Sequence, residues 1–326
     1  MNPDNRRIQT IFQAVKTYVK DGNHISIGGF TISRNPMACI HEIIRQNIKN
    51  LHVYAHSNGQ GLDELIGAGA VKRVEIAYSG NGRFAPTCIC FKRMVENNSV
   101  QVEDYSNFQM ALRFLAGSLG IPFMPTYSSL GTDIIEKWGF DTELRHQDNK
   151  IAREKIVVFD NPFVEKENID RLVLVPAINP DVTIIHAQKA DINGNTRIEG
   201  LTFSDVEQVK ASKHVIVTCE EIVEKSTLKE DPGSNHIPCF CVDAVVHIPL
   251  GAYPTACFNY YDYDPVFLEA YKTIASDYKR FMEYLENDIR GTENHSEFIQ
   301  KIAGDKRIKS IKADLKKGYS VGMKRK

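Results

Sequence analysis

Short apolar runs of strand length alternate with helix-like segments through this sequence, and this alternation constrains the fold more than any other feature. Residues 24–27, 51–55, 74–78 and 100–103 form such runs, and each is followed by apolar residues at helical spacing. A helix between two strands returns the chain to the starting edge, so the strands pair in parallel. We therefore expect an α/β fold with an open, mostly parallel sheet covered by helices on both faces.

The same pattern resumes in the second half of the sequence. Residues 141–155 are polar and charged, and we expect them to form an exposed insertion. Further strands are expected at 156–159, 172–175, 182–186, 215–218 and 244–248, and a mainly helical region at about 265–326. Because no repeat or low-complexity linker divides the sequence, we expect one domain over residues 1–326.

Charge and hydropathy argue against several functional classes. The formal net charge is −1, which gives no reason to expect nucleic acid or an anionic membrane as a partner. The sequence contains no apolar run of the roughly 18 residues that a membrane span requires. The segment Met1–Arg7 is polar and lacks the apolar stretch of a signal peptide. We expect a cytoplasmic protein.

Seven cysteines include two C-x-C pairs, Cys88 with Cys90 and Cys239 with Cys241. Zinc has to be considered for such pairs, but no C-x-x-C and no nearby histidine pair completes a ligand set. We expect buried free thiols and no metal site.

The most specific motif follows the first expected strand. Residues 21–30 read Asp-Gly-Asn-His-Ile-Ser-Ile-Gly-Gly-Phe, and Pro36 comes six residues later. Glycine allows another group to approach the backbone closely. The N–H groups of Gly28, Gly29 and Phe30 are therefore candidate donors to an oxyanion or a phosphate. The simpler interpretation is a tight turn between a strand and a helix.

Two further loops are expected beside this motif. Ligands of parallel sheets bind beyond the carboxyl ends of the strands, where loops 28–35, 56–61 and 79–86 should meet. Residues 80–85 fit the dinucleotide-binding pattern G-x-G-x-x-A. That match is short, Pro86 follows it directly, and nothing downstream is typical of a dehydrogenase. Gly80 and Gly82 remain candidates for contact with phosphate groups.

The glycine motif resembles the signature of family I coenzyme A transferase alpha subunits, which combines Asp/Asn-Gly, an apolar run, Gly-Gly-Phe and a proline. Similar segments continue in order over roughly residues 8–275. They include Leu-Gly-Ile-Pro-Phe at 119–123, Asp-Asn-Pro-Phe at 160–163 and Asp-Val-Thr-Ile-Ile-His at 181–186. Many members have glycine where this chain has Arg34. The glutaconate type of the family is most similar to this chain there, with arginine followed two residues later by proline.

The resemblance implies transfer of coenzyme A between an acyl-CoA and a free carboxylic acid, through covalent intermediates on a glutamate. Coenzyme A would be a substrate, and no permanently bound cofactor is expected. The family's nucleophile lies in a Ser-Glu-Asn-Gly segment of a beta-type chain, and this segment is absent here. We therefore expect a beta-type partner, without which this chain is inactive.

The resemblance also suggests roles for individual residues. Ser33 and Arg34 would meet the acyl group, and an arginine there suits a dicarboxylate such as glutaconate, because a guanidinium pairs with a carboxylate in two-bond geometry. The structural alternative is that Arg34 pairs with an acidic residue of its own chain or the partner. Asn58 would hold the thioester oxygen, or instead cap the following helix. The loop with Gly80 and Gly82 would bind the phosphates of coenzyme A.

Three acidic residues and two other functions stay open. Glu103 would act as a base, as in related ring-cleaving CoA hydrolases, or would hold a loop amide. Glu220 and Glu221 cannot easily share a site, because neighbouring strand residues point to opposite faces. We expect one to cap a helical turn and one to be exposed.

A CoA-dependent hydrolase or lyase on the same fold, or a non-catalytic acyl-CoA binding subunit, is the alternative function. A partner chain with Ser-Glu-Asn-Gly would favour the transferase over the hydrolase.

Overall fold

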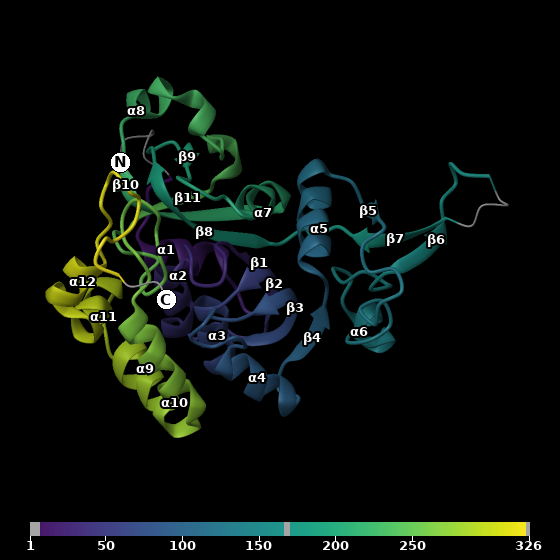
Figure 1. Ribbon diagram of the computed structural model, residues 1–326, viewed down its shortest axis with the longest axis horizontal. Coiled ribbons are helices and arrows are strands. Elements are labelled where there is room, and N and C mark those ends of the chain that lie inside the picture. Colours follow the sequence, from purple (N-terminus) through teal and green to yellow (C-terminus); the bar gives the residue numbers. More distant parts are fainter. Residues whose placement is uncertain (1–6, 166–169, 324–326) are drawn as a thin grey trace.

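The expected alternation of strands and helices forms the first third of the structure, a computed structural model that describes residues 7–165 and 170–323 (Figure 1). Residues 1–6, which carry most of the expectation about a signal peptide, lie outside the described residues. Capping boxes at Thr10 and Ser106 begin α1 and α5. The elements are α1 (Ile11–Tyr18), β1 (His24–Ile27), α2 (Met37–Arg45), β2 (Leu51–Asn58), α3 (Gln60–Gly67), β3 (Val71–Ser79), α4 (Ile89–Glu96), β4 (Gln101–Asp104) and α5 (Asn107–Leu119).

The main sheet confirms the expected parallel arrangement. Its strands lie in the order β11-β10-β8-β1-β2-β3-β4, and among the strands that the structure describes in this sheet only the short β9 pairs antiparallel, with β8. The second-half strands are β8 (Val182–Ala190), β9 (Thr196–Arg197), β10 (His214–Ile222) and β11 (Ala244–His247). The strand order reverses beside β1, which pairs with β2 on one side and β8 on the other. The loop after β1 therefore begins at a switch point, where ligands bind in such sheets.

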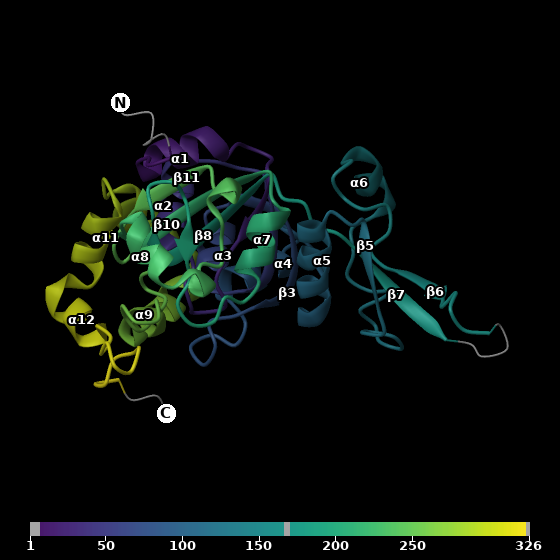
Figure 2. The same cartoon turned by 90° about the horizontal axis from the view of Figure 1, so that it is seen from above.

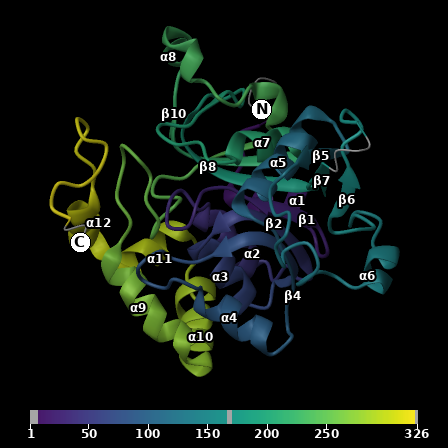
Figure 3. The same ribbon diagram turned by 45° about the vertical axis from the view of Figure 1, so that its right-hand side comes forward.

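Helices cover both faces of this sheet. On β8, Ile184 packs into the core beneath α1 to α4, whereas Ile185 packs into the core beside α7 (Asp205–Ala211) on the opposite face. Helix α5 packs against α7 on that second face. The first core also receives the C-terminal helices, which lie below and to the left of α5 in Figure 3. They are α9 (Pro265–Ser276), α10 (Tyr278–Tyr284), a π-helical turn (Leu285–Arg290), α11 (His295–Ile302) and α12 (Gly304–Ile311).

A second sheet stands beyond α5, away from the main sheet (Figures 1 and 2). It is antiparallel in the order β5-β7-β6, with β5 (Phe123–Thr126), β6 (Val157–Asp160) and β7 (Arg171–Pro176). The strands expected at 156–159 and 172–175 exist, but they belong to this sheet. No described helix is long and apolar enough to cross a membrane.

The expectation that 141–155 is an exposed insertion is wrong in part. The segment contains α6 (Thr142–Gln147), and Arg145 and Lys155 are buried. Arg145 pairs with Glu103, and the Lys155 ammonium lies 2.7 Å from an Asp104 carboxylate oxygen. These charges are buried because each has an ionic partner on β4, which the polar composition alone does not reveal.

Candidate active site

The three loops expected beside one another do meet at the carboxyl edge of the main sheet. Thr31, after β1, donates its N–H to the Ser57 carbonyl at 3.0 Å. The Gly80 N–H, after β3, donates to the Asn58 carbonyl at 3.2 Å. Because β1, β2 and β3 are adjacent and parallel, backbone hydrogen bonds join their loops into one surface.

Residues 28–35, which we call the glycine loop, are tightly folded. Phe30 and Ser33 exchange two backbone hydrogen bonds, each 2.8 Å long, across a two-residue turn. Gly29 has a φ of +79°. A Cβ at this position would lie 2.5 Å from the carbonyl oxygens of both Ser33 and Arg34. Only glycine fits there.

The expectation that three amides of this loop face a ligand is not met in this structure. The Gly28 N–H donates to the Ile184 carbonyl at 2.9 Å, and the Phe30 N–H donates to the Ser33 carbonyl. The Gly29 N–H donates to Oδ1 of Asp205 at 2.8 Å. Each donor already has a partner within the chain, so the motif works here as a braced turn.

Arg34 follows the structural alternative. Its side chain is buried, and Nη1 lies 2.6 Å from Oδ2 of Asp205. The guanidinium also donates to the carbonyls of His186 at 3.0 Å and Leu201 at 2.8 Å. A carboxylate of its own chain therefore neutralises this cation. The backbone φ of +49° at Arg34 also shows why glycine suits this position.

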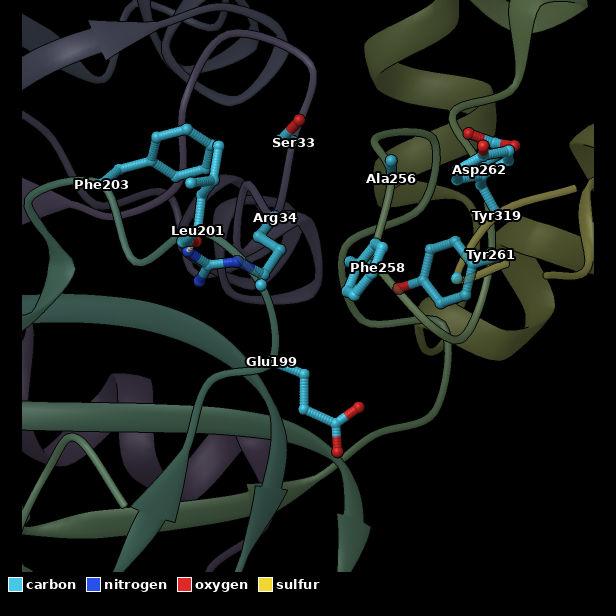
Figure 4. Close-up of a pocket in the computed structure, with 12 residues that line it drawn as sticks. Ser33, Arg34, Glu199, Leu201, Phe203, Ala256, Phe258, Tyr261, Asp262 and Tyr319 are labelled. Atoms are coloured by element: carbon cyan, nitrogen blue, oxygen red, sulfur yellow. Dashed lines mark hydrogen bonds between the residues drawn. The ribbon is translucent and has the colours of Figure 1, made fainter. Parts of the chain in front are cut away.

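A cavity of about 620 Å³ opens beside the glycine loop (Figure 4). Ser33 and Arg34 form part of its wall, and apolar or aromatic side chains form most of the rest. The volume falls within the range of small-molecule sites. The other lining residues are Glu199, Gly200, Leu201, Phe203, Ala256, Phe258, Tyr261, Asp262, Gly318 and Tyr319.

Glu103 lies away from this cavity. In the strand pairing, Glu103 lies opposite Glu75 on β3. Glu75 lies opposite Tyr54 on β2, and Tyr54 lies opposite Ser26 on β1. Glu103 is therefore level with Ser26, which comes before the glycine pair in the chain. Its carboxylate accepts hydrogen bonds from the Tyr105 hydroxyl at 2.8 Å and the Phe140 N–H at 3.0 Å, and pairs with Arg145. Burial and the nearby Glu75 carboxylate raise the pKa of Glu103. The geometry favours the structural interpretation, a partner for a loop amide, over a base.

Asn58 likewise takes the structural role. Its side-chain oxygen accepts the Leu62 N–H at 3.0 Å at the start of α3, and its amide nitrogen donates to the Gly28 carbonyl at 3.3 Å. Asn58 therefore caps the start of α3 and also holds the glycine loop through a hydrogen bond.

Gly80 and Gly82 do not form a dinucleotide-binding turn. A Cβ at Gly80 would lie 2.2 Å from the Tyr78 hydroxyl, whereas Gly82, with a φ of +57°, has open space around it. Helix α4 begins only at Ile89, beyond Pro86, so the glycines do not lead directly into a helix N-terminus. Gly82 remains accessible to a ligand.

Several residues that surround the glycine loop are missed by reasoning from the sequence. Asp205 is one, and Phe203, whose ring stacks on Phe30 with centroids 4.9 Å apart, is another. Both lie more than 170 residues away in the chain. The only local signal is that an acidic residue opens the helix after a Phe-Ser pair, which does not tell where its carboxylate points.

Glu220 is also placed differently from the expectation that one of the two glutamates caps a helical turn. Its carboxylate is buried, 2.7 Å from Nε2 of His186 and 2.7 Å from the Tyr261 hydroxyl. Glu221 is exposed, as expected for one of the pair. Within the described residues, His186, Glu220 and Cys257 place potential metal ligands within 4.8 Å of one another. In this structure His186 and Glu220 are hydrogen-bonded directly to each other, at 2.7 Å.

Comparison with known proteins identifies the family of this chain. Residues 8–247 match the family model described as coenzyme A transferase. The chain is 36% identical to one of the subunits of glutaconate CoA-transferase from Acidaminococcus fermentans, over 97% of this chain and 98% of the relative. It is 33% identical to one of the subunits of 3-oxoadipate CoA-transferase from Pseudomonas knackmussii, over 91% and 98%.

Solved structures show the same relationship. The crystal structure of the glutaconate coenzyme A-transferase from Acidaminococcus fermentans superposes with a TM-score of 0.92 at 36% identity, covering 97% of this chain and 98% of that chain. A variant of the decarboxylase AibA/AibB superposes with a TM-score of 0.69 at 29% identity, covering 87% and 98%. With the family model matching most of its length, this chain belongs to the coenzyme A transferase family.

Proposed function

We propose that this chain is the alpha-type subunit of an enzyme that moves coenzyme A between an acyl-CoA and a free carboxylic acid. The observation that supports it most is the 36% identity, over nearly the whole of both chains, to a protein named as one of the subunits of glutaconate CoA-transferase. Coenzyme A is a substrate in this proposal, and no permanently bound cofactor is required. A beta-type partner completes the active site and supplies the nucleophilic glutamate.

The proposed reaction proceeds by two acyl exchanges at that glutamate. Its carboxylate attacks the thioester carbonyl, and the carbon–sulfur bond breaks. The coenzyme A thiolate departs, and an acyl-glutamyl anhydride remains on the enzyme. The thiolate then attacks the glutamyl carbonyl and releases the free acid, which leaves coenzyme A on the enzyme as a thioester. The acceptor acid reverses both steps. In this scheme the cavity beside the glycine loop receives part of the acyl-CoA.

The identity of the acid is a narrower question. Relatives named for glutaconate and 3-oxoadipate make a dicarboxylate a reasonable candidate. The pairing of Arg34 with Asp205 argues against Arg34 as the residue that binds its second carboxylate. A cytoplasmic location is part of the proposal, because the acyl-CoA substrates are found there.

Co-expression tests the proposal. The chain would be purified alone and together with the product of the adjacent reading frame in the genome. Transfer of coenzyme A from acetyl-CoA to a panel of acids, glutaconate included, is expected only with the partner. Turnover by the isolated chain would contradict the need for a second chain.

A hydrolase is the second candidate, because one chain of a cholesterol ring-cleaving hydrolase of Rhodococcus jostii is 25% identical over 85% of this chain. Free coenzyme A appearing without an acceptor acid, with a partner lacking Ser-Glu-Asn-Gly, would favour it. Binding of acyl-CoA without turnover, even with the partner, would instead indicate a non-catalytic subunit.

A further inference from the structure

One carboxylate fastens both ends of the glycine loop. Oδ1 of Asp205 accepts the Gly29 N–H at 2.8 Å, and Oδ2 accepts Nη1 of Arg34 at 2.6 Å. The Asp205 side chain is fully buried, at 0% exposure, so water does not compete for either contact. Charge-assisted hydrogen bonds of this kind are among the stronger contacts in proteins.

The segment that precedes Asp205 adds three further contacts. The Leu201 carbonyl accepts Nη2 of Arg34 at 2.8 Å. The Phe203 ring stacks on Phe30 with 14° between the ring planes, and the Arg34 guanidinium carbon lies 5.6 Å from its centroid. We call residues 199–205 the brace segment. Because it also lines the cavity, it connects the glycine loop to the cavity wall (Figure 4).

The loop needs such support because its backbone is strained. Thr31 and Arg34 have φ values of +47° and +49°, in the left-handed region that side chains other than glycine rarely adopt. Residues held there relax unless surrounding contacts prevent it, and they concentrate at functional sites. Loss of the Asp205 contacts would therefore release Gly29 and Arg34 together, and Ser33 and Arg34 would shift in the cavity wall.

We propose that Asp205 is a positioning residue, which holds the glycine loop in the conformation required for coenzyme A transfer. The inference rests on the proposed function for its kinetic part. Asp205 would not touch the reacting atoms, since both of its oxygens are occupied by the loop. Its effect would come through the geometry of the cavity wall, where small displacements change the rate of the chemical step more than binding.

Two substitutions in the assembled enzyme separate the contacts. Asp205→Asn keeps an oxygen that can accept the Gly29 N–H but loses the charge opposite Arg34, whereas Asp205→Ala loses both. We expect kcat to fall about tenfold and about a hundredfold, respectively, with KM for acyl-CoA changed by less than about threefold. Glu207→Gln is the matched control, because it removes the same charge from a half-buried position on the same helix. It should leave kcat unchanged.

A second measurement does not depend on turnover. Hydrogen exchange of the full chain should be faster in the peptide covering residues 29–34 of Asp205→Asn than in wild type, with no change over β10. If Asp205→Ala does not assemble, Arg34→Lys takes its place, because lysine keeps the charge but cannot reach the three acceptors of Arg34 together. Arg34→Lys should also lower kcat more than it changes KM.

The outcomes distinguish the two proposals. The positioning role would be overturned by a wild-type kcat in Asp205→Asn and in Asp205→Ala, or in Arg34→Lys where that variant replaces Asp205→Ala. A lower melting temperature with an unchanged kcat would also overturn it. A wild-type complex that transfers no coenzyme A would refute the proposed function instead, and the exchange rates would then decide whether Asp205 holds the loop.

Discussion

The imidazole rings of His24 and His52 stack on neighbouring strands, with centroids 4.2 Å apart and 17° between their planes. Nδ1 of His24 lies 2.8 Å from the Tyr54 hydroxyl, and Nε2 lies 3.1 Å from an Asp148 oxygen. Burial, followed by the neighbouring His52, lowers the pKa of His24 to about 4. This histidine is therefore neutral in the folded protein at pH 7.

Acid should destabilise the protein through His24. In the unfolded chain a histidine titrates near pH 6.5, so between pH 6.5 and pH 4 the unfolded state binds more protons. The free energy of unfolding should fall by about 2 kcal/mol between pH 7.5 and pH 5 from this residue alone. Chemical denaturation of wild type and His24→Gln at both pH values measures this contribution. It is the difference between the two proteins in how much the free energy of unfolding changes with pH. Equal pH dependence in both would contradict the expectation.

Glu64 on α3 should make the protein less stable as the pH rises. Burial raises the pKa of Glu64 to about 7, although Gln60 and Tyr284 donate hydrogen bonds to it. Because its folded pKa lies above the unfolded value, its contribution to stability is complete below about pH 4.5 and is lost as the pH rises through 7. Glu64→Gln, which mimics the protonated form, should gain about 2 kcal/mol relative to wild type between pH 5 and pH 8. Denaturation at the two pH values tests this, and a constant difference would refute it.

Gly29→Ala should disrupt the glycine loop. A Cβ would overlap two carbonyl oxygens at 2.5 Å, in a left-handed backbone that alanine disfavours. We expect turnover of the complex to fall at least about a hundredfold, because the cavity wall would shift, with a loss of stability of a few kcal/mol. Gly120→Ala is the control, because Gly120, at the C-terminal end of α5, has a φ of +69° but no atoms within 4 Å of an added Cβ. It should cost only about 1 kcal/mol and leave turnover intact. Normal turnover in Gly29→Ala would show that the loop is only a turn.

Glu103→Gln should weaken the fold more than the chemistry. The substitution leaves Arg145 buried without its ionic partner, which typically costs about 3 kcal/mol or more. Because Glu103 lies away from the cavity, kcat of the complex should stay within about twofold of wild type. Thermal unfolding and steady-state kinetics on one preparation test both statements. A large loss of kcat with an unchanged melting temperature would restore the role as a base.

Arg34→Ala tests whether Arg34 holds the glycine loop or binds a carboxylate of the substrate. If Arg34 holds the loop, the substitution should lower kcat/KM for glutaconate and for acetate by similar factors, about tenfold or more. A carboxylate-binding role would instead raise KM for glutaconate far more than for acetate. Kinetics with the two acids on wild type and variant distinguish the roles, and a selective loss for glutaconate would contradict the structural one.

The sequence alone determined the architecture of the main sheet and predicted a candidate site at one edge of it. Apolar spacing reflects which backbone conformation buries side chains locally, so strands such as 24–27 and 51–55 could be recognised without tertiary contacts. Parallel strands then place the loops after them at a common edge. The motif around Gly28 and Gly29 also indicated the family, which the comparisons confirmed.

Only the tertiary structure decided which groups the site residues contact. Asp205 reaches Gly29 from 176 residues away, and Glu103 meets Arg145 across 42 residues. The strands at 157–160 and 171–176 have ordinary strand sequences, yet they form a separate sheet. Hydrogen bonds and ion pairs between distant segments depend on how helices and sheets pack. Local propensity carries no record of that packing, because it reflects only interactions between residues close together in the chain.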